Sequence, residues 1–221
     1  MIWSRPSPGA SRWPGRLLAL TVEAMGRIHG GVTELVIAAE LPARFTRAVA
    51  SARAVRTRPE ISLEEIEAPR RIAPYSFALG ASVLTGGEEP VSGRLILLHD
   101  PQGHPAWQGE TRIVSYVTAE LEPDIGHDAM FAPVGWAWLT EALHVQQAGY
   151  RAVAGTVTQI SSTRFGEMTG PEQTTDVEMR ASWTPESDEV GPHVQAWCAL
   201  LASTAGLPPP GISSLAAKRR F

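Results

Sequence analysis

The stretch from Gly93 to Ile125 constrains the fold of this chain more than any other. Arg94 to His99 and Thr111 to Ala119 are rich in the apolar and β-branched residues that form strands. Between them, Asp100-Pro-Gln-Gly103 has Pro at the second and Gly at the fourth position of a turn. Strands joined by a tight turn run antiparallel, so the sequence predicts an antiparallel sheet.

Hydrophobic periodicity assigns the other elements. Period-two alternation predicts strands, and recurrence every three or four residues predicts amphipathic helices. Helices are expected over 42–58, 133–149 and 192–206, strands over 75–83, 94–99, 111–119, 153–160 and 177–183, and a polar loop over 161–175. This order, α-βββ-α-ββ-α, predicts the α+β class, with an antiparallel sheet of about five strands and helices packed on it. The order resembles type III secretion chaperone-like folds, an analogy that gives no function.

The composition predicts how the chain is divided. Of its 221 residues 43% are apolar, which suffices for one core, and residues 41–209 are expected to form a single α+β domain. Residues 1–40 open with a segment rich in Pro, Ser, Gly and Arg, which is typical of disorder. The alternative is a wrongly assigned extension with the true start at Met25. Residues 210–221 are expected to be a disordered tail.

Charge, cysteine content and hydropathy limit the classes of protein. The net charge of −4 is unusual for a protein whose whole surface binds nucleic acid. Cys198 is the only cysteine, so no internal disulfide is possible and a cytoplasmic location is expected. No apolar run approaches the roughly 20 residues that span a bilayer, so no membrane association is expected.

Several short motifs resemble a known family. They include Arg71-Ile-Ala-Pro-Tyr75, Leu98-His-Asp-Pro101, Trp136-Ala-Trp-Leu-Thr140 and Arg180-Ala-Ser-Trp-Thr-Pro185. Together they resemble the domain-of-unknown-function 3000 family of uncharacterised actinobacterial proteins, over roughly Leu41 to Pro209. The resemblance implies no activity. Among the lysine and arginine residues of the chain only Lys218 is a lysine, and this bias toward arginine agrees with a high-GC bacterial genome.

His99, Asp100 and His104 form the most metal-like group in the sequence. Histidine and aspartate are common zinc and iron ligands, but a catalytic centre needs at least three converging ligands. The neighbouring Pro101 and Gly103 favour the alternative, a structural turn in which Asp100 binds the backbone. Neither a catalytic residue nor a cofactor is assigned from the sequence.

Basic and aromatic residues supply the candidates for binding. Five arginines and no acid lie between Leu41 and Pro59, which indicates either a solvated helix face or a docking surface for acidic protein or phosphate. Trp107 stands in a turn, where it could stack on a base or on a partner side chain. Arg164 lies in a hydroxyl-rich loop. The candidate binding residues are Arg44, Arg47, Arg53, Arg56, Trp107 and Arg164.

Three hypotheses about function follow. The first is a non-enzymatic protein-binding or adaptor module, with another protein as partner. The second is an RNA-associated factor, which the arginines of the first helix would support if they gathered beside Trp107. The third is a metal-dependent enzyme, which would require His99, Asp100 and His104 to converge with a further acid.

Overall fold

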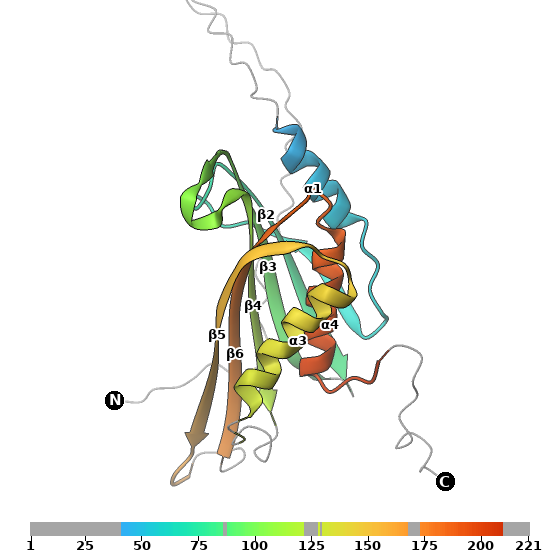
Figure 1. The fold of residues 1–221 in the computed structure, drawn as a ribbon. Helices are drawn as coiled ribbons and strands as arrows, with labels where there is room; N and C mark the ends of the chain where they lie inside the picture. Colours follow the sequence, from blue (N-terminus) through green and yellow to red (C-terminus); the bar gives the residue numbers. More distant parts are fainter. Residues whose placement is uncertain (1–40, 86–87, 122–127, 129, 168–172, 210–221) are drawn as a thin grey trace, which may run out of the picture. The chain divides into compact units, whose positions relative to one another are not determined.

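The structure, a computed structural model, describes residues 41–85, 88–121, 128, 130–167 and 173–209. Within these ranges the strands form one antiparallel sheet of six (Figure 1). The strands are β1 (Ile61–Ile66), β2 (Tyr75–Thr85), β3 (Glu88–His104), β4 (Gly109–Leu121), β5 (Tyr150–Thr163) and β6 (Gln173–Pro185). The helices are α1 (Ala43–Arg53), α3 (Phe131–Val145), α4 (Gly191–Thr204) and the 3₁₀ turn η1 (Pro105–Trp107).

The strand order in the sheet is β1-β2-β3-β4-β6-β5. β1 to β4 form a meander in which each strand pairs with the next one along the chain. After α3 the chain returns as β5, and β6 then fills the position between β4 and β5. β1 and β5 are therefore the two edges of the described sheet.

The expected α+β class is confirmed, but the number of strands is not. The sequence predicts three strands before α3, whereas the structure has four, because Ile61–Ile66 forms β1. The sequence pattern does not predict this strand because it contains Glu64 and Glu65, and charged residues in succession are uncommon in strands. An edge strand tolerates them because both side chains are exposed to water. The similarity to chaperone folds stays a prediction.

Other boundaries also differ. β3 continues through the predicted turn at Asp100–Gly103 to His104, so the hairpin with β4 is longer than expected. The predicted loop over 161–175 is shorter, because β5 runs to Thr163 and β6 begins at Gln173. The predictions for residues 1–40 and 210–221 concern residues outside the described ranges.

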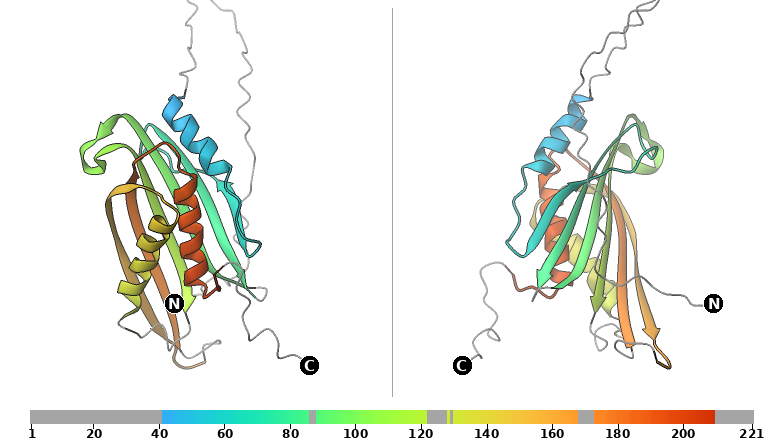
Figure 2. Two further views of the ribbon diagram at one scale, coloured as in Figure 1. Left: turned by 45° about the vertical axis from the view of Figure 1, so that its right-hand side comes forward. Right: turned by 180° about the vertical axis from the view of Figure 1, so that it is seen from behind.

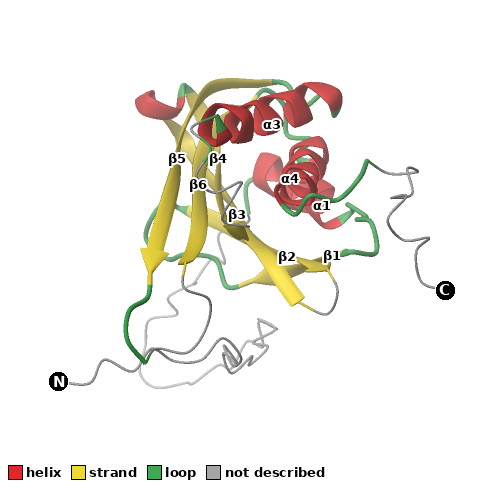
Figure 3. Cartoon of the chain, turned by 90° about the horizontal axis from the view of Figure 1, so that it is seen from below, coloured by secondary structure: helices red, strands yellow, loops and turns green. Residues whose placement is uncertain are grey.

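The helices α1, α3 and α4 all lie on one face of the sheet, and no described helix covers the other face (Figures 2 and 3). α4 supplies the centre of the core, with Val194, Trp197 and Leu201 fully buried. Val117 and Met179 of the sheet belong to the same core cluster. Burial of a large apolar side chain stabilises a fold by roughly 2 kcal/mol, so this layer dominates the stability.

Gly93 on β3 allows α4 to approach the sheet closely. A Cβ atom at this position would lie 2.9 Å from Trp197 Cζ2, 3.0 Å from the Tyr116 carbonyl oxygen and 3.1 Å from Leu201 Cδ2. Distances this short require the neighbours to move. Gly93 is therefore a packing residue, because its lack of a side chain leaves room for α4.

A buried polar pair fixes the start of α4. Trp183 on β6 donates from its indole Nε1 to His193 Nδ1 at 3.1 Å, and neither residue is more than 1% exposed. Burial penalises the charged imidazolium and lowers the pKa of His193 from 6.5 to about 4. His193 is therefore neutral in the folded protein at physiological pH.

We predict that Gly93→Ala lowers the free energy of unfolding by about 1–3 kcal/mol, because the added methyl group overpacks the contact with Trp197. Urea unfolding measures the change. Arg94→Ala, on the next residue and exposed, is the control and should change stability by no more than about 0.5 kcal/mol. Equal effects of the two substitutions would contradict the packing role of Gly93.

We also predict that His193 makes stability depend on pH. Between pH 6.5 and pH 4 the unfolded chain binds a proton that folded His193 does not. The free energy of unfolding therefore falls as the pH is lowered through this window, by about 3 kcal/mol in total. Chemical denaturation at a series of pH values should show a flatter dependence for His193→Gln. His144→Gln, at an exposed position, should keep the wild-type slope.

Candidate functional site

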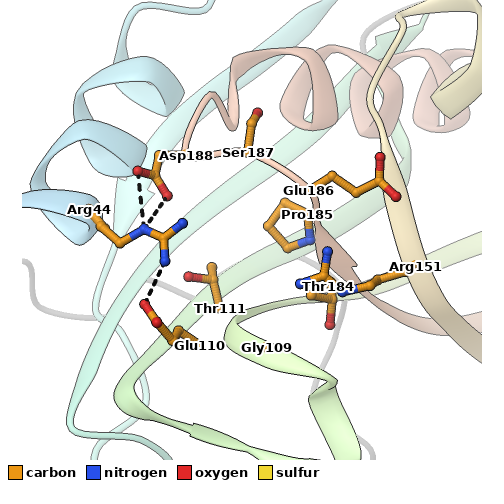
Figure 4. A pocket seen from close by; sticks show the side chains of 10 residues that line it. All are labelled: Arg44, Gly109, Glu110, Thr111, Arg151, Thr184, Pro185, Glu186, Ser187 and Asp188. Carbon is orange, nitrogen blue, oxygen red and sulfur yellow. Dashed lines mark hydrogen bonds and ion pairs between the residues drawn. The ribbon is translucent and has the colours of Figure 1, made fainter.

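Two arginines of the predicted basic surface form a salt-bridge network at the start of α1, and Figure 4 shows the contacts of Arg44. Arg44 Nη1 pairs with Glu110 Oε2 at 2.8 Å, and its Nε donates to Asp188 Oδ1 at 3.1 Å. Arg47 Nη2 also pairs with Asp188, at 2.6 Å. Glu110 begins β4 and Asp188 precedes α4, so these arginines fasten α1 to the rest of the domain.

Further along α1 the arginines are also paired. Arg53 makes two bonds of 2.9 and 2.8 Å to the carboxylate of Glu65 on β1, and its guanidinium lies 5.3 Å from the ring centroid of Phe77. Arg56, which follows the end of α1, is the exception: among the described residues its only hydrogen bond is one of 3.3 Å from Nη1 to the carbonyl oxygen of Val55. The surface predicted to attract phosphate is thus largely neutralised by carboxylates.

His99, Asp100 and His104 do not converge. His99 is 1% exposed, shares a 2.9 Å hydrogen bond with Thr111 Oγ1 and stacks on Phe45. Burial of the imidazole ring lowers the pKa of His99. Asp100 Oδ1 accepts the backbone N–H of Gln102 at 2.9 Å, as in a structural turn. No group of three or more His, Cys, Asp or Glu within the described ranges is placed to hold a metal ion.

Cys198 lies in the core on α4. Burial raises the pKa of its thiol to about 12, so almost no thiolate exists at neutral pH. The side chain therefore has the properties of a small apolar residue and not those of a nucleophile.

Trp107 lies at the tip of the β3–β4 hairpin, in η1, which projects away from the helices (Figure 2). Its ring stacks on His104 with centroids 5.1 Å apart, and its carbonyl oxygen accepts a hydrogen bond from Thr184 Oγ1. Arg151 Nε donates to the carbonyl of Gln108 at 2.9 Å. These bonds hold the tip against β5 and β6, and Trp107 is half-buried as a result.

A hollow of about 130 Å³ opens between the α1 network and the hairpin tip (Figure 4). Its lining residues are Arg44, Gly109, Glu110, Thr111, Arg151, Thr184, Pro185, Glu186, Ser187 and Asp188. Arg44 and Arg151, the two cations in the lining, already bind protein acceptors. The hollow is therefore a space where several structural elements meet, and its two cations already have partners within the protein. Arg164, the remaining candidate, is half-buried after the end of β5 and makes contacts of its own.

A different group of residues lies together on the sheet face that no described helix covers. The strand registers place Gly80, Arg94, Tyr116, Arg180 and Thr156 side by side across β2, β3, β4, β6 and β5. The next row includes Ser92 and Thr118, whose hydroxyl groups lie 3.1 Å apart. We call the set Arg94, Tyr116 and Arg180 the central row of the helix-free face.

Two members of the central row are held rigidly. The Tyr116 hydroxyl donates to Glu178 Oε2 at 2.8 Å, and this bond is the main reason that the pKa of Tyr116 is raised. Arg180 Nε pairs with Glu178 Oε1 at 2.6 Å, and its guanidinium lies 5.5 Å from the Tyr116 ring centroid. The aromatic ring is thus fixed in position on the surface.

Arg94 completes the row and differs from the arginines of α1. It is exposed, and within the described part of the chain it has no hydrogen-bond or ion-pair partner. Its guanidinium can therefore donate hydrogen bonds to a carboxylate of another molecule without losing a bond within the protein. Sequence reasoning missed this residue, although its alternation with Leu95 in a strand would have placed it on the polar face.

None of the helices in the described ranges has the length and apolar character required to cross a bilayer. No curated protein and no solved structure matches the chain. The sequence profile of a protein family matches residues 41–213, which include every described helix and strand. The chain therefore belongs to the family described as Protein of unknown function (DUF3000).

Proposed function

We propose that this chain is a non-enzymatic protein-binding module whose partner docks on the helix-free face around Arg94. The observation that carries the proposal is the exposed guanidinium of Arg94, which has no partner within the described part of the chain and lies beside the hydrogen-bonded Tyr116. Arginine and tyrosine are the residue types, with tryptophan, that most often dominate the energy of protein interfaces. A partner with a carboxylate opposite Arg94 and an apolar group against Tyr116 would match this surface.

The charge of the helix-free face favours a protein over RNA. Glu120 and Asp176 lie directly opposite each other on β4 and β6, and Glu178 lies one position farther along the same face. The carboxylates of Glu120 and Asp176 beside the central row would repel a phosphate backbone, whereas that of Glu178 is paired with Arg180. They tolerate a folded protein surface, which carries charges of both signs.

The buried groups support a role without catalysis. Acid–base and nucleophilic chemistry needs titratable side chains that a substrate can reach. His99, His193 and Cys198 are all buried and lie apart from the helix-free face.

We also propose that the protein is cytoplasmic, because its single cysteine forms no internal disulfide. We propose an actinobacterial source as well, which the bias toward arginine supports.

We predict that Arg94→Glu lowers partner binding at least tenfold, because it replaces the guanidinium with a charge that repels the partner's carboxylate. The tagged protein would be purified from its host with nuclease present, and co-purifying proteins quantified by mass spectrometry. Arg56→Glu, the same charge reversal at an exposed position in the segment between α1 and β1, is the matched control and should keep the partner.

Two results would overturn the proposal. Loss of the partner with Arg56→Glu but not with Arg94→Glu would move the binding surface to the segment that follows α1. Co-purifying material that disappears on nuclease treatment would support the RNA-associated alternative.

A further inference from the structure

β5 is an edge strand of the described sheet, and most of its length lacks the residues that usually prevent edge strands from pairing with other chains. Within the described sheet it pairs only with β6. Its residues 152–163 contain no charged residue and no proline. Natural proteins usually interrupt exposed edges with lysine, other charges, proline or a bulge, because free N–H and C=O groups are a template for another strand.

The opposite edge shows these protections. β1 has six residues, and two of them, Glu64 and Glu65, are exposed acids. β5 is 14 residues long, and its only register shift lies near its start, between Arg151 and Ala154. From Ala154 to Thr163 the ladder with β6 is regular, so the outer edge of this segment is straight enough to accept a strand.

The sequence of β5 is self-complementary about Val157. Read outward in both directions, Val157 is flanked by Thr156 and Thr158, then by Gly155 and Gln159, then by Ala154 and Ile160. A two-fold antiparallel pair centred on Val157 would place each residue opposite its counterpart on the second copy. Threonine would then face threonine, and at the next two positions a small residue would face a large one.

We infer that β5 pairs with β5 of a second copy of this chain, in the antiparallel register centred on Val157. Cross-strand threonine pairs stabilise antiparallel strands, and opposing small and large residues fill the space between them. Ile160, which is 46% exposed, would be covered beside Ala154 of the second copy. All residues from Ala154 to Ile160, the regular segment that is symmetric about Val157, are uncharged, so no like charges face each other within it.

The symmetry of this interface favours a second copy over an unrelated extended peptide. A two-fold interface uses the same surface on both subunits and must be complementary to itself, which is what the pattern about Val157 provides. The sheet would continue through both subunits with the helix-free faces on one side. The inference rests on the β5 edge alone and does not depend on the partner proposed for the helix-free face.

Sedimentation velocity over a concentration series tests the inference with three forms of the full chain. The wild type should form a dimer. Thr156→Lys with Thr158→Lys should sediment as a folded monomer, because the register places the introduced lysines opposite each other. Thr156→Lys with Thr158→Glu should restore the dimer, because lysine then faces glutamate across the interface. Ser62→Lys with Ser92→Lys, at exposed positions on β1 and β3, is the charge-matched control and should stay dimeric.

Each contrary result overturns the inference in a distinct way. A monomeric wild type would mean that the edge is free or takes another partner. A dimer that survives the double lysine substitution would place the interface elsewhere. Dissociation by the lysine–glutamate variant would disprove the register about Val157. None of these results changes the expectation that Arg94→Glu recovers less partner than the wild type does. Failure of this inference and failure of the proposed function can therefore be distinguished.

Discussion

The contact between α4 and the centre of the sheet determines the architecture of this protein. Trp197 is fully buried against β3, and it reaches that position because Gly93 has no side chain to obstruct it. The contact seals one face of the sheet with α4, and α1 and α3 pack around it. The helices occupy that face, and no described helix covers the opposite face, on which Arg94 and Arg180 are exposed.

The arginines show how charge is distributed in the fold. Those of α1 resemble a binding surface in the sequence, yet Arg44 and Arg47 pair with Asp188 and fasten the helix in place. Arg112 is buried on the helix-free side and binds only neutral acceptors, including the carbonyl of Ala152 at 2.8 Å. Arg94 alone in the central row has no partner in the described structure. The role of each arginine therefore depends on the residues around it in the fold, and not on how many charged residues lie near it in the sequence.

Local patterns in the sequence predicted the element order well, because burial on one face produces alternation in strands and a three-to-four spacing in helices. They failed at Ile61–Ile66, where exposed acids on an edge strand break the alternation. The candidate binding residues failed for a different reason. Arg44 and Asp188 are 144 positions apart, and no local pattern reveals such a pairing. The row formed by Arg94, Tyr116 and Arg180 likewise needs the strand register, which single-sequence reasoning did not provide.

Hydrogen–deuterium exchange of the chain, measured with and without its captured partner, tests most directly whether the helix-free face is the binding surface. Backbone amides in 92–96, 114–118 and 178–182 should become more protected, because these segments form the helix-free face around the central row. Exchange in α1 should be unchanged. Protection confined to α1, with no change in the three strand segments, would contradict the account.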